Sequence, residues 1–139
     1  MTEARLALGR RGEDMAQRWY SERGYRLLAR NWRCPAGELD LVVADDRQIV
    51  FCEVKTRASS RFGTGFEAVT ADKQRRVRRL AAEFLRRAGR AGSDDAAGSA
   101  AADGLEPGAA RHIRAVRGRL RFDVASIVAG RIEVMQAAF

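Results

Sequence analysis

The chain of 139 residues has the length of one ordinary domain, and its composition, 46% hydrophobic and 32% charged, is that of a globular protein. Its formal net charge of +8 predicts an anionic partner, most simply nucleic acid, although arginine-rich composition can also reflect codon usage. The two cysteines show no pairing pattern of a secreted domain, and no apolar run is long enough for a signal peptide or a membrane span. We therefore expect a single cytoplasmic domain over residues 1–139, without membrane contact.

The first half of the chain predicts a helix followed by three antiparallel strands. Thr2 can cap a helix that runs to about Gly24, because glycine readily adopts the left-handed conformation found after helix ends. Strands are expected at "YRLLARNWR", "GELDLVVA" and "QIVFCEVKTR", with "DDR" as the turn between the last two.

The second half predicts a helix, an insertion and a closing hairpin. Thr70 caps the helix "TADKQRRVRRLAAEFLRRA", which has apolar residues at helical spacing. Residues 89–110 are small, polar and acidic, and predict a flexible insertion. The segments "RLRFDVASIV" and "RIEVMQAAF", joined by "AG", predict a hairpin. The predicted fold class is α/β, with a central mixed sheet of about five strands flanked by helices in the order α-β-β-β-α-β-β.

Charged residues interrupt the third predicted strand on one face only. Residues two apart in a strand share a face, so Glu53 and Lys55 project together, while Val50, Cys52 and Val54 fill the opposite face. In the second strand the apolar residues Leu39, Leu41 and Val43 match that opposite face. Asp40 then lies on the same side as Glu53 and Lys55.

The hairpin register places two of these carboxylates opposite each other. A two-residue loop at Asp46 and Arg47 makes paired positions sum to 93, which sets Asp40 against Glu53. Like charges opposed on a sheet face are destabilising unless a cation lies between them. Carboxylate oxygens suit Mg²⁺ or Mn²⁺, ions that also take oxygens from a substrate phosphate.

Lysine at position 55 is unusual in this chain, because of 26 basic residues only Lys55 and Lys73 are lysine. Beside a metal that activates water, a compact ammonium can orient the attacking water or a phosphoryl oxygen, and arginine delivers its charge differently. The alternative is that Asp40 and Glu53 are solvated residues of the sheet face, partly neutralised by Lys55 and nearby arginines.

The segments "GRRGEDMA", "GYRLLARNWRCPAGELDLVV", "IVFCEVKTR", "FGTGFEAVTADKQRRV" and "LRFDVASI" occur in an order that resembles the PD-(D/E)xK nuclease superfamily. A more specific resemblance is to the small bacterial YraN-like proteins, which are similar to archaeal Holliday-junction resolvases. "GELD" stands where the superfamily signature has its proline.

The resemblance implies a restriction-endonuclease-like core and a set of site residues. The implied catalytic residues are Asp40, Glu53, Lys55, Glu13 and Lys73. The implied ligands of Mg²⁺ or Mn²⁺ are Asp40, Glu53, Glu13 and Val54. A homodimer is a further expectation, because superfamily members that cut two strands commonly act as dimers.

Basic residues around this site predict contacts with phosphates. Arg57 and Arg61 follow the catalytic strand, and the second helix adds Lys73, Gln74, Arg76 and Arg79. The alternative for the helical arginines is a solvated helix face.

The function we expect is metal-dependent hydrolysis of DNA phosphodiesters, selective for branched or damaged DNA in repair or recombination. The alternative is a non-catalytic DNA-binding or repair-accessory protein that retains the fold. RNA as the substrate is a third, weaker alternative.

Overall fold

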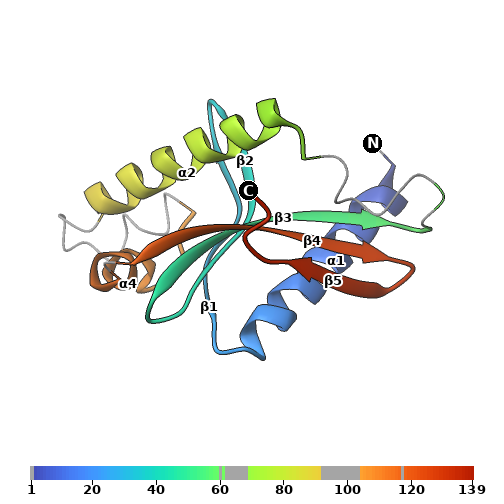
Figure 1. The fold of residues 1–139 in the computed structure, drawn as a ribbon, viewed down its shortest axis with the longest axis horizontal. Helices are drawn as coiled ribbons and strands as arrows, with labels where there is room; N and C mark the ends of the chain where they lie inside the picture. The colour runs from blue at the N-terminus through green and yellow to red at the C-terminus, as the bar shows by residue number, and fades with distance from the viewer. Residues whose placement is uncertain (1, 60, 62–68, 92–103, 117) are drawn as a thin grey trace.

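The computed structural model describes residues 2–59, 61, 69–91, 104–116 and 118–139, and shows a sheet between two helical layers (Figure 1). In chain order the described elements are α1 (Glu3–Ser21), β1 (Arg26–Cys34), β2 (Gly37–Ala44), β3 (Gln48–Arg57), α2 (Ala71–Ala91), α4 (Ala109–Ala115), β4 (Arg119–Val128) and β5 (Arg131–Met135). Helix α1 covers one face of the sheet, and α2 covers the other together with α4. The predicted α/β class is confirmed, and α4 is an additional helix.

The described part of the chain forms one five-stranded mixed sheet in the order β1-β2-β3-β4-β5. All neighbouring strands are antiparallel except β3 and β4, which run parallel. A parallel pair needs a long crossover connection, and the segment that contains α2 and α4 is this crossover. Strand β3 therefore lies at the centre of the sheet, with a helical layer on each side.

The register of the β2–β3 hairpin is the predicted one. Its pairs run from Leu41 opposite Cys52 to Ala44 opposite Ile49, so paired positions sum to 93. The Asp45 carboxylate shapes the two-residue loop, because it accepts the backbone N–H groups of Arg47 and Gln48. The loop length therefore sets which residues of the two strands face each other.

Helix α1 begins and ends as predicted. The Thr2 side chain accepts the backbone N–H of Arg5 at 3.3 Å, and Gly24 has φ +84° just after the helix. Gly12 is buried against β3, where an added Cβ would clash with the Thr56 side chain, so glycine permits the close contact between helix and strand.

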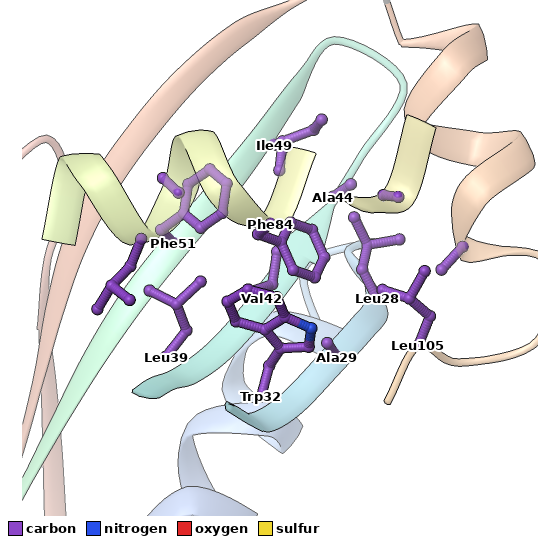
Figure 2. Close-up of a cluster of buried hydrophobic side chains, with 14 of the residues drawn as sticks. Leu28, Ala29, Trp32, Leu39, Val42, Ala44, Ile49, Phe51, Phe84 and Leu105 are labelled. Atoms are coloured by element: carbon purple, nitrogen blue, oxygen red, sulfur yellow. The ribbon is translucent and has the colours of Figure 1, made fainter. Parts of the chain in front are cut away.

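Aromatic rings fill the core between the sheet and α2 (Figure 2). Phe84 of α2 is fully buried, and its ring makes edge-on contacts with Trp32 of β1 and Phe51 of β3, at centroid distances of 5.3 and 5.8 Å. Edge-to-face pairs add about 0.5–1.5 kcal/mol beyond the burial of their surface. These contacts hold α2 across β1 and β3, and thereby fix the position of its first turn.

A buried polar network ties the sheet to α1 and to the C-terminal segment. Asp123 of β4 is fully buried and accepts hydrogen bonds from the Tyr20 hydroxyl at 2.6 Å and from the Arg121 guanidinium, twice, at 2.8 Å. It also accepts the backbone N–H of Ala137 at 3.0 Å. These partners satisfy the buried charge, as a buried carboxylate requires.

Leu39 lies on the opposite side of the sheet from the predicted one. It packs in the α2-side core beside Trp32 and Val42 rather than with Leu41 and Val43. Its partner in β1, Trp32, also packs on the α2 side, whereas Arg30, the partner of Leu41, contacts α1. Asn31 lies between these two β1 residues and has a left-handed φ of +51°. The simple alternation of faces therefore fails at Leu39.

The predicted insertion over residues 89–110 lies mostly outside the described residues. Of its ends, Gly89 belongs to the last turns of α2, and Leu105 and Ala109 are buried against the α2-side core. His112, the single histidine of the chain, is half-buried on α4, and its Nε2 is 3.0 Å from the Asp45 carbonyl oxygen.

Candidate active site

The candidate site lies where β3 leaves the buried part of the sheet. The strand is buried from Ile49 to Glu53 and half-buried from Val54 to its end. On the α2 side of this end, a hollow of about 440 Å³ is lined by Asp40, Glu53, Lys55, Lys73 and Arg76, together with residues 36–38 at the start of β2. The structure therefore brings the carboxylates of the hairpin and both lysines of the chain to one place.

Asp40 is held by the backbone of the neighbouring strand. The regular β2–β3 pairs end at Leu41 and Cys52. Beyond this pair, the Asp40 Oδ2 accepts the Val54 N–H at 2.9 Å. Burial, and next the charge of Glu53, raise the pKa of Asp40 to about 7, against the lowering effect of the Val54 hydrogen bond. Two carboxylates thus lie close together in a partly desolvated place, where each disfavours the ionisation of the other, as in many catalytic sites.

Glu53 is buried and paired with a lysine of α2. Its side chain is 11% exposed, and its Oε2 lies 3.6 Å from the Lys73 Nζ. Lys73 lies in the first turn of α2, where its backbone N–H donates to Thr70 Oγ1 at 3.2 Å. The N-terminal cap of the helix therefore sets the position of this ammonium.

The two lysines are neighbours. Burial, followed by the neighbouring Lys55 side chain, lowers the pKa of Lys73, while the charge of Glu53 acts in the opposite direction. Lys55 in turn helps to lower the pKa of Asp40. Two acids and two ammonium groups are therefore electrostatically coupled at the end of β3.

Glu13 of α1 lies beside this group and is held by β1. Its Oε2 accepts the Asn31 Nδ2–H at 2.9 Å and the Arg30 Nε–H at 3.3 Å. Its charge still contributes to the raised pKa of Asp40. Arg30 and Asn31, which orient Glu13, were not predicted from the sequence. The one indication of a special role for Asn31 is that asparagine tolerates a left-handed φ better than most residues.

The acidic residues fit a hard divalent cation in the manner of Mg²⁺. Within the described ranges no three His, Cys, Asp or Glu side chains are close enough together to hold an ion without other ligands. Mg²⁺ characteristically uses one or two carboxylates and keeps several waters, a role that Asp40 and Glu53 can fill. Because the N–H and C=O of a strand residue face the same neighbour, the Val54 carbonyl also points toward the β2 side, where Asp40 lies.

The predicted nucleic-acid-binding residues separate into groups. Lys73, Arg76 and Arg79 line one hollow along the exposed side of α2, and Arg76 also lines the hollow of the carboxylates. The Gln74 side chain donates to the Val69 carbonyl at 3.3 Å, and Arg61 is exposed beyond the end of β3. Arg57, at the end of β3, lines a different groove on the α1 side.

In the described part of the molecule no helix has the length and apolar character needed to cross a membrane.

The family model and the similar proteins point to the same family. A sequence model described as "Uncharacterised protein family UPF0102" matches residues 12–127. A UPF0102 protein of Frankia casuarinae is 56% identical over 82 residues, which cover 59% of this chain and 70% of that protein. A UPF0102 protein of Moorella thermoacetica is 49% identical over 92 residues, covering 66% and 77%, respectively. The chain belongs to the UPF0102 family, the YraN-like family that its motifs resemble.

Proposed function

We propose that this protein is a Mg²⁺- or Mn²⁺-dependent endonuclease of the restriction-endonuclease-like type, which hydrolyses phosphodiesters in DNA. The observation that carries the proposal is the convergence of Asp40, Glu53, Lys55 and Lys73 at the end of β3, with the pKa of Asp40 raised to about 7. Such perturbation by burial and by a specific charged neighbour is characteristic of functional sites.

Asp40 and Glu53 would hold the cation, with the Val54 carbonyl as a backbone ligand and Glu13 as a nearby acidic residue. When bound, Mg²⁺ or Mn²⁺ supplies neutralisation of the phosphate charge and acidification of a coordinated water. The negative charges of Asp40 and Glu53 would stabilise the bound cation. Without a cation, the two carboxylates repel each other.

Lys55 is the residue best placed to act on the reacting phosphate. Its ammonium lies beside Asp40 and Lys73 in the same hollow, and can donate hydrogen bonds to a phosphoryl oxygen or to the attacking water. Lys73 neutralises Glu53 in the ion-free protein. Arg76, from the next turn of α2, lies at the edge of the hollow and can bind an adjacent phosphate.

The positive charge of the protein supports DNA as the substrate, bound through its phosphates and not through its bases. The net charge is +8, and α2 presents Arg76 and Arg79 along one side. Contacts of arginine with phosphates give affinity and orientation without reading sequence. We therefore propose that selection rests on the structure of the DNA, as in repair or recombination.

A cleavage panel tests the proposal. Single strands, duplexes, flaps, hairpins and four-way junctions are incubated with Mg²⁺ or Mn²⁺ and with wild-type protein or Lys55→Ala. We expect cleavage of at least one substrate, lost with EDTA and reduced by about 10²-fold or more in Lys55→Ala.

The competing function is a DNA-binding accessory protein without catalysis. Binding of branched or single-stranded DNA with no metal-dependent cleavage of any substrate would establish that alternative. Including the corresponding RNA strands in the panel separates a deoxyribonuclease from a ribonuclease.

A further inference from the structure

A second groove reaches the same end of β3 from the opposite face of the sheet. It has a volume of about 690 Å³ and lies between the N-terminal half of α1 and the end of β3, which are neighbours in Figure 1. Its lining includes Arg5, Leu8, Gly9, Glu13, Lys55 and Arg57. Arg5, Leu8 and Gly9 do not line the hollow of Asp40 and Glu53.

The two hollows meet at the catalytic strand. Val54 and Lys55 line both the α1-side groove and the α2-side hollow that contains Asp40 and Glu53. Helices α1 and α2 cover opposite faces of the sheet. A chain bound in both places must therefore pass around the end of β3 from one face to the other.

The α1-side groove has the charge of an anion-binding surface. Arg5, Lys55 and Arg57 contribute three positive charges to its lining, and Glu13 is its one acidic residue among those described. The Glu13 carboxylate is already engaged by Arg30 and Asn31 of β1. The groove therefore suits phosphates, and Leu8 adds an apolar surface against which a sugar or a base can lie.

The bend between the two hollows selects among nucleic acids. Duplex DNA has a persistence length of about 50 nm, so a sharp turn at one phosphate is costly for a duplex. An unpaired strand turns at any phosphate. We propose that the groove between α1 and β3 binds an unpaired DNA strand that leaves the scissile phosphate, so that the substrate is single-stranded or branched where it is cut.

This inference rests on the proposed function for the position of the scissile phosphate, but strand binding can be measured without cleavage. Gly9 offers a clean way to block the groove, because a Cβ at this position would meet no atom within 4 Å. Glutamate is also a better helix former than glycine by roughly 0.5–1 kcal/mol. Gly9→Glu therefore places bulk and negative charge in the groove without disturbing the fold.

Gly89 provides the matched control. It is also a helical glycine whose added Cβ would meet no atom within 4 Å, and it lies near the opposite end of α2 from Lys73. Gly89→Glu changes the composition and the net charge of the protein in the same way as Gly9→Glu. Thermal unfolding of both variants verifies that the fold is intact, and Arg5→Gln is a second groove variant at an exposed position.

The measurement is fluorescence anisotropy of a labelled oligothymidine, a flap and a blunt duplex, with EDTA in place of the metal. We expect Gly9→Glu to weaken binding of the oligothymidine and the flap by about tenfold or more and to leave duplex binding unchanged. Gly89→Glu should not weaken binding of the oligothymidine or the flap in this way. Equal weakening of all three ligands, or no weakening in both Gly9→Glu and Arg5→Gln, overturns the inference. If Gly9→Glu selectively loses strand binding but the wild-type protein cleaves no substrate, the groove binds an unpaired strand and the proposed nuclease activity is wrong. The failure of either proposal can therefore be told from the failure of the other.

Discussion

The Asp40 carboxylate accepts the backbone N–H of Val54 at 2.9 Å, at the point where regular pairing between β2 and β3 stops. A side chain thus replaces the backbone as the partner of the central strand. The hydrogen bond fixes the carboxylate beside Glu53 even though the two charges repel each other. This rigid pair of repelling carboxylates is the feature on which the proposed cation site rests.

The raised pKa of Asp40 predicts that replacing this residue with a side chain that cannot ionise stabilises the protein, by an amount that depends on pH. Its folded pKa of about 7 is above the ordinary 3.8, so the folded state retains a proton that the unfolded state has lost between these values. The contribution of Asp40 to stability is therefore present at low pH and lost as the pH rises through 7. An asparagine side chain at this position would keep the acceptor for the Val54 N–H without the charge.

We therefore expect Asp40→Asn to raise the free energy of unfolding at pH 8 in EDTA by roughly 1 kcal/mol or more, and by less at pH 5. Thermal unfolding of wild type and variant at both pH values measures the difference. Mg²⁺ should stabilise the wild type at pH 8 and leave the variant unaffected. An equal effect of the substitution at pH 5 and pH 8 would contradict the assigned environment of Asp40.

Lys73 should matter most when no metal is bound. Its Nζ is 3.6 Å from the Glu53 Oε2, and its removal leaves a buried carboxylate beside Asp40 without its cation. We expect Lys73→Met to destabilise the protein by about 1–3 kcal/mol in EDTA at pH 8, and Mg²⁺ to restore more stability to the variant than to the wild type. Chemical unfolding with and without Mg²⁺ gives both values, and a loss of stability that Mg²⁺ does not reduce would show that Lys73 is not part of the proposed metal site.

Arg76 should bind a phosphate, whereas Arg86 on the same helix should not. Arg76 lines the hollow of the carboxylates, and Arg86 forms an ion pair with Glu83 further along α2. For Arg76→Gln we expect weaker DNA binding and a fall of about 1 in the slope of log affinity against log salt. Arg86→Gln is the matched control, with the same loss of charge. Identical slopes for the two variants would show that only net charge is being measured.

Two glycines of α1 should respond in opposite directions to alanine. An added Cβ at Gly9 meets no neighbouring atom, while at Gly12 it clashes with Thr56 of β3. Gly9→Ala should stabilise the protein by up to about 1 kcal/mol, because alanine favours the helix. Gly12→Ala should destabilise it by about 1–3 kcal/mol, because the helix must move away from the strand. Urea unfolding measures both, and a stabilising Gly12→Ala would disprove the close packing of α1 on β3.

The sequence was sufficient to predict the elements whose local patterns agree with their surroundings. Strands β2, β3 and β4 begin and end at the predicted residues, because alternating or continuous apolar runs are bounded by turn residues there. The register followed from the two-residue loop at Asp46 and Arg47. The proximity of Asp40, Glu53 and Lys55 follows directly from that register.

Other features depend on contacts that no local pattern encodes. Helix α4 spans only seven residues, Ala109–Ala115, and such a short helix is stabilised by packing, here of Ala109 and Ala110 against the α2-side core. The side change of Leu39 is shared by its partner Trp32 in β1, so it involves both strands. The contact of Lys73 with Glu53 depends on how α2 crosses the sheet, which aromatic packing at Phe84 determines.

The most direct test of the proposed nuclease site is metal-dependent cleavage by two variants that differ only in which glutamate is neutralised. Glu53→Gln removes the buried carboxylate of the site, and Glu133→Gln makes the same chemical change at an exposed position on β5. Both proteins and the wild type are assayed on a labelled flap and a four-way junction with Mn²⁺. We expect cleavage by the wild type and by Glu133→Gln, and none by Glu53→Gln. Undiminished cleavage by Glu53→Gln, or no cleavage by any of the three proteins, would contradict the proposed nuclease site.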